Sequence, residues 1–213
     1  MADVRALTGR EVRQAVPALM RAFWTYPETV HLLPDEHRRR HVLPRYLASD
    51  ARDSSSHGWL LGADRGGEIV GAAAWLPPEA YPISVARQLR QVAELVPVAP
   101  WALGAARRAR QGQRRNRQVH GGRPPHYWLR AIGVDPAWQG MGIGSDLLGP
   151  ALDRADNERR GCYLLTAIAE NVGWYERFGF ATVAEYHPTP RWPKVWAMWR
   201  DPTAAQSAPL RKQ

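Results

Sequence analysis

The sequence is poor in cysteine and has no long apolar run. Its single cysteine, Cys162, cannot form a disulfide within the chain, which agrees with a reducing compartment, and we expect a cytoplasmic protein. No apolar run approaches the roughly 20 residues of a membrane-spanning helix, and residues 1–7 lack the apolar core of a signal peptide. The composition therefore disfavours a disulfide-stabilised secreted domain and predicts no membrane partner.

Metal-ligand spacing is missing as well. The histidines stand in no pattern with the cysteine that is typical of a zinc site, so we assign no metal. The histidines considered are His31, His37, His41 and His57. Cys162 lies in an apolar stretch with no histidine near it in sequence, which disfavours it as a nucleophile.

Positive charge is abundant: the formal net charge is +9 at pH 7. Much of the excess lies in one segment, in Arg107, Arg108, Arg110, Arg114, Arg115 and Arg117. We interpret this cluster as a solvated helix or loop, because a nucleic-acid platform would interleave aromatic residues, which the segment lacks. We therefore expect no nucleic-acid partner. A basic rim that steers a phosphate-rich cofactor to its site is an alternative.

Hydrophobic periodicity predicts the elements of the first half of the chain. A strand and a first helix are expected over 4–23, with Thr8 as the helix cap, and a second helix over 35–49. Apolar runs at 58–63 and 69–75 surround a turn, which predicts a β-hairpin.

The second half is expected to begin with a basic helical insertion over 84–120, placed before the fourth strand. Its first helix is predicted by an apolar stripe of Val85, Leu89, Val92 and Leu95. The later elements are a strand over 126–134, a helix from Gly142 or Gly144, a strand over 162–167, a helix over 172–178, and strands over 181–187 and 195–199. We expect residues 1–203 to form a single domain, followed by a disordered tail over 204–213.

A glycine-rich loop, Gln139-Gly140-Met141-Gly142-Ile143-Gly144, joins the strand that ends at Val134 to the following helix. Glycines let the backbone approach an anion, and the free N–H groups and dipole of the helix start attract it. A Walker loop would need a lysine, and a Rossmann fingerprint would need Gly-x-Gly-x-x-Gly spacing. A purely structural glycine turn is the remaining alternative.

A second motif follows about thirty residues later. Tyr175 stands four residues after Asn171, so both side chains share one face of a helix. A tyrosine hydroxyl beside a cofactor can donate a proton to a leaving thiolate, and an asparagine can hold a carbonyl or amide. The alternative is a short amphipathic helix whose aromatics, Trp174, Phe178 and Phe180, belong to the core.

The two motifs together resemble those of the GCN5-related N-acetyltransferase (GNAT) family, whose cofactor motif is Gln/Arg-x-x-Gly-x-Gly/Ala. Order, spacing and flanking elements agree over about residues 128–180. The resemblance implies an α/β fold with a mixed, splayed sheet flanked by helices, and acetyl-CoA as cofactor. The implied cofactor contacts are Ile132, Gly133, Val134, Gln139, Gly140, Met141, Gly142, Ile143, Gly144, Ser145 and Asn171.

Within that family the chain looks closest to the puromycin N-acetyltransferase group. By that analogy Tyr26 lines the acceptor pocket, although it can equally be a helix-end tyrosine, and Trp75 is a second candidate for substrate binding. One departure is Leu165, which stands where that group has an acidic residue on the strand before the Asn–Tyr helix. Glu170, Glu79 and Asp135 are unconvincing substitutes.

We therefore expect an acetyl-CoA-dependent N-acetyltransferase that acts on the primary amine of a small molecule. The amine would attack directly in a ternary complex, with Tyr175 as general acid. Alternatives are a protein lysine or N-terminus as acceptor, a non-catalytic acyl-CoA-binding module, or a nucleic-acid-binding protein that uses the arginine cluster. A monomer and a homodimer are both compatible with the sequence.

Overall fold

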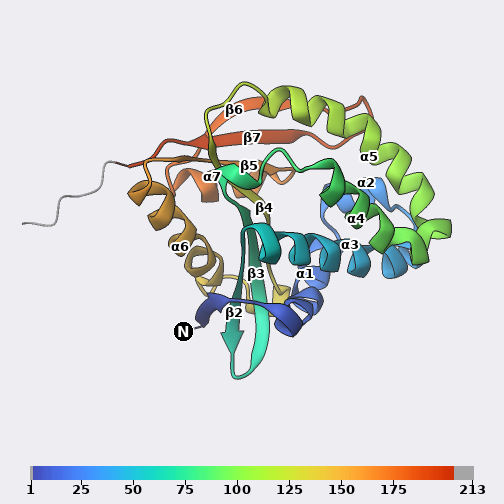
Figure 1. The fold of residues 1–213 in the computed structure, drawn as a ribbon, viewed down its shortest axis with the longest axis horizontal. Helices are drawn as coiled ribbons and strands as arrows, with labels where there is room; N and C mark the ends of the chain where they lie inside the picture. The colour runs from blue at the N-terminus through green and yellow to red at the C-terminus, as the bar shows by residue number, and fades with distance from the viewer. Residues whose placement is uncertain (1, 204–213) are drawn as a thin grey trace, which may run out of the picture.

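The computed structural model describes residues 2–203 (Figure 1), so the tail predicted over 204–213 lies outside the described residues. Strands within this range form one mixed seven-stranded sheet in the order β1-β2-β3-β4-β5-β7-β6. Their bounds are β1 Asp3–Ala6, β2 Trp59–Arg65, β3 Glu68–Leu76, β4 His126–Val134, β5 Gly161–Thr166, β6 Ala181–Tyr186 and β7 Val195–Arg200. The predicted α/β fold with a mixed sheet flanked by helices is confirmed.

The sheet opens between β4 and β5, its one parallel pair. These strands pair only from His126 opposite Gly161 to Leu129 opposite Leu164. Beyond Leu129, β4 continues along β3 alone, up to Val134 opposite Gly71. The register between β3 and β4 shifts at Arg130, which has no partner residue on β3 and so forms a β-bulge. The splay and the bulge therefore lie at the same point of the sheet.

The helices are α1 Ala15–Phe23, α2 Pro27–Leu32, α3 Glu36–His57, α4 Val85–Leu95, α5 Ala99–His120, α6 Ile143–Asn157 and α7 Ala169–Glu176. The first helix is shorter in the structure than predicted, because a 3-10 turn, η1 (Gly9–Gln14), precedes α1. This places Pro17 in the first turn of α1, where its missing N–H costs little. Pro27 is the first residue of α2, a helix that periodicity did not predict.

Helix α3 runs eight residues beyond the predicted end at 49, to His57. The prediction stopped there because the last turns are polar, yet Ser49, Asp50, Asp53 and Ser54 are buried. The insertion forms α4 and α5, joined by η3 (Val96–Val98), and precedes β4 as predicted. Strand β5 and helix α7 begin one and three residues earlier than predicted, respectively.

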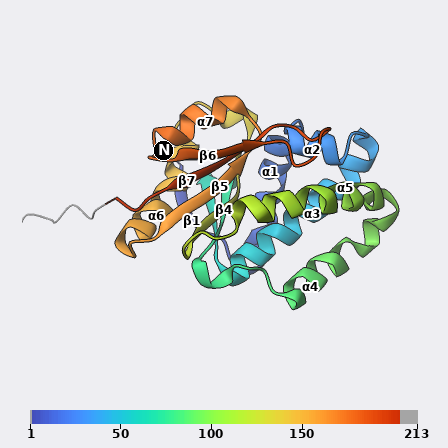
Figure 2. The ribbon, with the colours of Figure 1, turned by 90° about the horizontal axis from the view of Figure 1, so that it is seen from above.

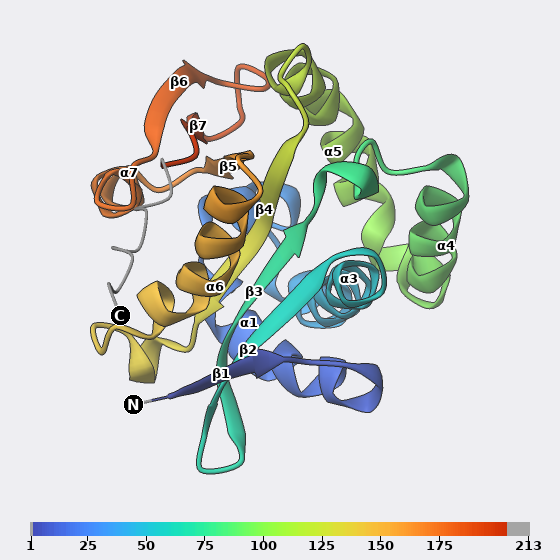
Figure 3. The same ribbon diagram turned by 60° about the vertical axis from the view of Figure 1, so that its left-hand side comes forward.

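Helices cover the sheet on both faces (Figure 3). On one side, here called the α6 face, Leu147, Leu148 and Tyr175 pack against alternate residues of β2 to β5. On the other, the α3 face, side chains of α1, α3 and η3 pack against the remaining residues of β2 and β3. No helix in the described part of the chain is long and apolar enough to cross a bilayer.

Helix α4 lies at the periphery, beside α3 (Figure 2). The apolar stripe that predicts it faces outward: Val85 is 71% exposed, Leu89 64% and Val92 63%. Its buried residue is a charged one, Arg87. The helix is therefore held in place by polar contacts rather than by its apolar stripe.

Candidate active site

The glycine-rich loop lies between β4 and α6. The carboxylate of Asp135 accepts a hydrogen bond from the N–H of Ala137, at 3.1 Å, and so caps the short turn η4 (Pro136–Trp138). The Gln139 side-chain amide donates to the carbonyl of Val134, at 2.9 Å. Gly140 (φ 77°) and Gly142 (φ 82°) have left-handed backbone angles that other residues rarely adopt. Local hydrogen bonds therefore hold a conformation that requires these two glycines.

The loop presents free backbone donors. The N–H groups of Gln139 and Ser145 bond to the carbonyls of Pro136 and Gly142, whereas those of residues 140–144 donate to no group among the described residues. A Cβ atom built on Gly140 or Gly142 would meet nothing within 4 Å, so open space lies before them. Five unpaired donors at a helix start, with the helix dipole behind them, fit a diphosphate.

The end of β4 supplies a second set of free backbone groups. The N–H of Asp135 donates to the carbonyl of Val70 on β3. Because N–H groups alternate in direction along a strand, those of Ile132 and Val134 point to the opposite edge of β4, where β5 no longer pairs with it. Gly133 has a different role. A Cβ there would lie 2.9 Å from the Cβ of Ala22, so glycine allows α1 to pack closely on β4.

Helix α7 carries both residues of the second motif. Tyr175 is 4% exposed and lies between the rings of Trp174 and Phe180, with centroids at 4.8 and 5.8 Å. Its hydroxyl has no hydrogen-bond partner in the described range, and burial, together with the nearby Tyr26, raises its pKa. The phenol therefore remains protonated at neutral pH.

Contacts join α7 to the glycine loop. A Cβ on Gly144 would lie 3.1 Å from the indole of Trp174, so the start of α6 packs directly on α7. Asn171 is half-buried, and its backbone N–H donates to Ile168 at 3.2 Å. Trp174 and Phe178 are partly buried against the core, and Phe180 is 2% exposed, so the aromatics of the motif also pack as core residues.

Tyr26 connects the first helices to the opening of the sheet. It lies between α1 and α2, and its hydroxyl accepts a hydrogen bond from the N–H of Ala167, just after β5, at 2.8 Å. The second predicted acceptor residue lies elsewhere. Trp75 has no exposed surface and belongs to the core of the α6 face, so a ligand would have to displace other side chains to touch it.

Glu28, on α2, is an acidic residue of this region that the sequence did not reveal. Its Oε1 accepts a hydrogen bond from the Trp192 indole at 2.8 Å, and no cationic side chain within residues 2–203 pairs with it. Burial raises its pKa. Burial also raises the pKa of Tyr26, and the charge of Glu28 adds to that shift. The carboxylate thus lies near Tyr26 and lacks a counter-charge among the described residues.

The acidic substitutes considered from the sequence lie in other surroundings. Glu79 and Glu170 are exposed, and Asp135 is bound by the Arg21 side chain at 2.6 Å. Cys162 has no exposed surface, and burial raises its pKa to about 12, so its thiol is not available as a nucleophile.

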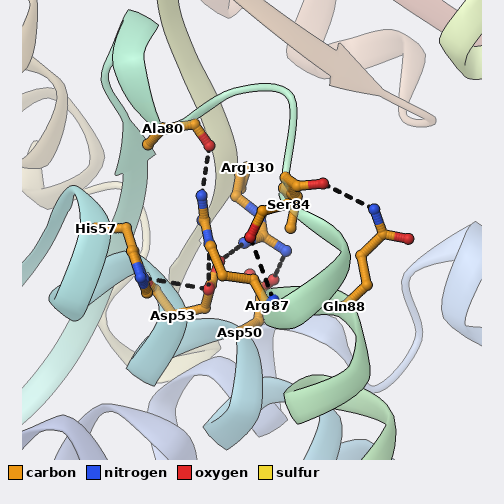
Figure 4. Close-up of polar contacts among 9 residues, drawn as sticks. Asp50, Asp53, His57, Ala80, Ser84, Arg87, Gln88 and Arg130 are labelled. Carbon is orange, nitrogen blue, oxygen red and sulfur yellow. Dashed lines mark hydrogen bonds and ion pairs between the residues drawn. The ribbon is translucent and has the colours of Figure 1, made fainter.

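A buried ionic network holds the bulge of β4 (Figure 4). Arg130 pairs with Asp50 and, at 2.7 Å, with Asp53, both on α3. Arg87 of α4 binds both oxygens of Asp53, at 2.9 and 2.6 Å, and also the carbonyl of Ala80. Burial opposes the charge on Asp53, but the two arginines outweigh it and lower its pKa. One carboxylate therefore ties α3, the insertion and β4 together.

Comparison with known proteins agrees with this architecture. A family model described as Acetyltransferase (GNAT) family matches residues 16–180, and the chain belongs to that family. Members generally use acetyl-CoA as acyl donor, so acyltransferase activity follows from the family.

Solved structures share the fold at low sequence identity. A Corynebacterium glutamicum protein described as histone acetyltransferase HPA2 and related acetyltransferase aligns with a TM-score of 0.67 and 21% identity, over 97% of this chain and 99% of that one. Arylalkylamine N-acetyltransferase 2 from Aedes aegypti aligns with a TM-score of 0.59 and 13% identity, over 94% of this chain and 99% of that one. The Escherichia coli ribosomal-protein-S18-alanine N-acetyltransferase aligns with a TM-score of 0.54 and 14% identity, over 98% of this chain and 99% of that one.

Proposed function

We propose that this protein transfers an acetyl group from acetyl-CoA to the primary amine of a small molecule. The observation that carries the proposal is Glu28, a carboxylate without a counter-charge, next to Tyr26 at the opening of the sheet. A carboxylate surrounded by protein favours a cation beside it, because an unpaired buried charge is costly. The aromatic ring of Tyr26 would favour an ammonium group further.

The glycine loop and the end of β4 would hold the cofactor. The free N–H groups of residues 140–144 would bind the diphosphate, and the unpaired backbone of Ile132 and Val134 would pair with the pantetheine amides. The Asn171 side chain would hold a carbonyl of the same arm. Bound acetyl-CoA supplies an acetyl thioester, whose C–S bond breaks as the new C–N bond forms.

Two protons have to move, and the proposal assigns them to Glu28 and Tyr175. An alkylamine arrives as its ammonium form, and Glu28, whose pKa is raised, would accept the first proton and free the nitrogen lone pair. Tyr175 would donate its proton to the departing sulfur. The nitrogen loses a second proton as it becomes an amide, which restores the phenol, so the net products are an amide, a thiol and one released proton.

Two other functions remain to be separated from this one. The Escherichia coli neighbour is named as acting on an alanine of ribosomal protein S18, and a protein acceptor would make peptides the better substrates. A non-catalytic acyl-CoA-binding module would bind the cofactor and release no thiol with any amine. The half-buried position of Glu28, bonded to the Trp192 indole, favours a small acceptor over a protein chain.

The test is a mass-spectrometric acceptor screen with acetyl-CoA. It includes puromycin, arylalkylamines, polyamines, aminoglycosides and peptides. We expect thiol release and an acetylated product with a small amine, and kcat/KM about 10- to 100-fold lower for Glu28→Gln. Glu36→Gln, an exposed carboxylate on α3, is the matched control. Acetylation of peptides alone would transfer the proposal to a protein acceptor, and cofactor binding without thiol release would leave only the binding module.

A further inference from the structure

A hollow lies on the α3 face, between η1, α3 and the junction of α4 with α5. Its volume is about 560 Å³, within the range of small-molecule sites. The charged residues that line it are Arg13, Arg40, Arg45, Arg52 and Glu94. The glycine loop belongs to the α6 side of the sheet, so this basic groove is a separate site.

The groove carries an excess of positive charge. Four arginines and one glutamate give a local charge of +3, with histidine neutral. The glutamate is already engaged, because Arg52 donates to Glu94 at 2.7 Å. Within the described chain, no carboxylate pairs with the other three arginines. Like charges around one hollow repel each other, and an anion between them would remove that repulsion.

Other arginines of the same helices are bound within the protein. The guanidinium of Arg39 donates to the carbonyls of Leu33, Trp24 and Pro34, at 2.9, 3.1 and 3.2 Å. Arg108, from the cluster on α5, donates to the carbonyl of Leu32. Arginines with a structural role thus have protein acceptors, whereas Arg13, Arg40 and Arg45 have none among the described residues.

The wall of the groove is built from packed residues. The ring of His41 stacks on Trp101, with centroids 4.8 Å apart and planes at 18°. The Nδ1 of His41 lies 2.8 Å from the carbonyl of His37, to which it donates. Val98 beside them is 4% exposed and belongs to the core of the α3 face. A ligand would therefore enter a preformed surface.

We propose that the basic groove binds a small molecule that carries at least two adjacent phosphate groups, such as a nucleoside diphosphate. The unpaired guanidinium groups of Arg13, Arg40 and Arg45 would bind the phosphate oxygens, which suit the planar fork of arginine. The histidine–tryptophan wall would contact the rest of the ligand. This site is independent of the acetyl transfer proposed above.

The experiment is a calorimetric titration of the full chain with ADP and with inorganic pyrophosphate, at low salt and with acetyl-CoA held at saturation. Both probes should bind, adenosine should not, and the affinity should fall steeply as salt is added. Arg40→Ala and Arg45→Ala should each weaken ADP binding about fivefold. Arg38→Ala, an exposed arginine on the same helix but outside the groove, should change it less than about twofold.

Three outcomes would overturn the proposal. One is the absence of binding of either probe once acetyl-CoA occupies its own site. Another is an equal loss of affinity in Arg38→Ala, which would mean that only the general charge of the helix matters. The third is a short DNA duplex that binds more tightly than ADP and depends on Arg40 and Arg45, since the groove would then belong to a nucleic-acid surface. Because the groove is independent of acetyl transfer, the Arg40→Ala and Arg45→Ala variants should transfer acetyl groups as fast as the wild type.

Discussion

The two faces of the sheet handle charge in different ways. On the α6 face, the candidate cofactor site is made of backbone, namely the N–H groups of residues 140–144 and the dipole of α6. On the α3 face the charges belong to side chains, namely Glu28 without a counter-charge, Asp53 shared by two arginines, and the groove arginines. A backbone site depends on conformation, whereas a side-chain site can be abolished by one substitution.

The largest effect is expected from Tyr175→Phe, which removes one hydroxyl and keeps the ring that packs against Trp174 and Phe180. We expect kcat to fall about 10²- to 10⁴-fold, the usual contribution of a general acid, with acetyl-CoA affinity unchanged. Thiol release measures the first quantity and calorimetry the second. Equal turnover in the variant would remove Tyr175 from the mechanism.

Asp53→Ala tests the side-chain network of the α3 face. It leaves Arg87 and Arg130 buried without their shared carboxylate, so the free energy of unfolding should fall by about 3–5 kcal/mol. Urea denaturation measures this change. Asp153→Ala, an exposed aspartate on α6, is the control and should leave stability nearly unchanged. A similar small loss in both variants would show that the network does not hold the insertion.

Gly142→Val tests the backbone site. A valine at φ 82° is strained, and its side chain would enter the open space before the loop, so the Kd for acetyl-CoA should rise about tenfold or more. Gly149→Val is the matched control, because that glycine also has nothing within 4 Å but lies inside α6 with an ordinary helical angle. Native affinity in Gly142→Val would contradict the assignment of the loop.

The smallest effect concerns the far end of α6. Arg200 of β7 binds both oxygens of Asp156, at 2.7 Å each. Burial opposes the charge, but hydrogen bonds from Arg200 and Thr203 lower the pKa of Asp156 from 3.8 to about 2. Because the folded pKa is the lower one, this stabilisation is present above pH 3.8 and is lost as pH falls toward 2.

The contribution of Asp156 is about 1 kcal/mol, because the solvent around this partly exposed pair screens it. Acid titration of thermal stability should show a loss in this window for the wild type and a smaller one for Asp156→Asn. An identical acid transition in both proteins would show that Asp156 contributes nothing to it.

The same contrast explains what the sequence could predict. The apolar runs of the strands, the glycine loop and the spacing of Asn171 and Tyr175 are local patterns, so the strands, α6 and α7 could be predicted from them, with shifts of a few residues at their ends. Glu28 was missed because α2 was not expected, and because its hydrogen-bond donor, Trp192, comes from a distant segment. The end of α3 was missed because its polar residues are buried only through arginines of α4 and β4.

The apolar stripe of α4 predicts an element correctly but not its packing. Val85, Leu89 and Val92 predict the helix correctly, yet they do not show which side is buried, because Arg87 is the residue that docks. The arginine cluster of α5 likewise predicts a basic helix, but Arg108 turns inward to the carbonyl of Leu32. Periodicity identifies a helix, and the partners of its charged residues decide how it packs.

The bonds around α2 also bear on the order in which the molecule folds. The hydrogen bond from Ala167 to Tyr26 joins residues 141 positions apart, and that from Trp192 to Glu28 joins residues 164 apart. Such contacts close long loops, so they form late and slow the search for the native state. During synthesis, the hydrogen-bond donor of Glu28 is made only when nearly the whole chain has been synthesised. A chain cut short before Trp192 would thus retain the glycine loop and lack a finished acceptor site.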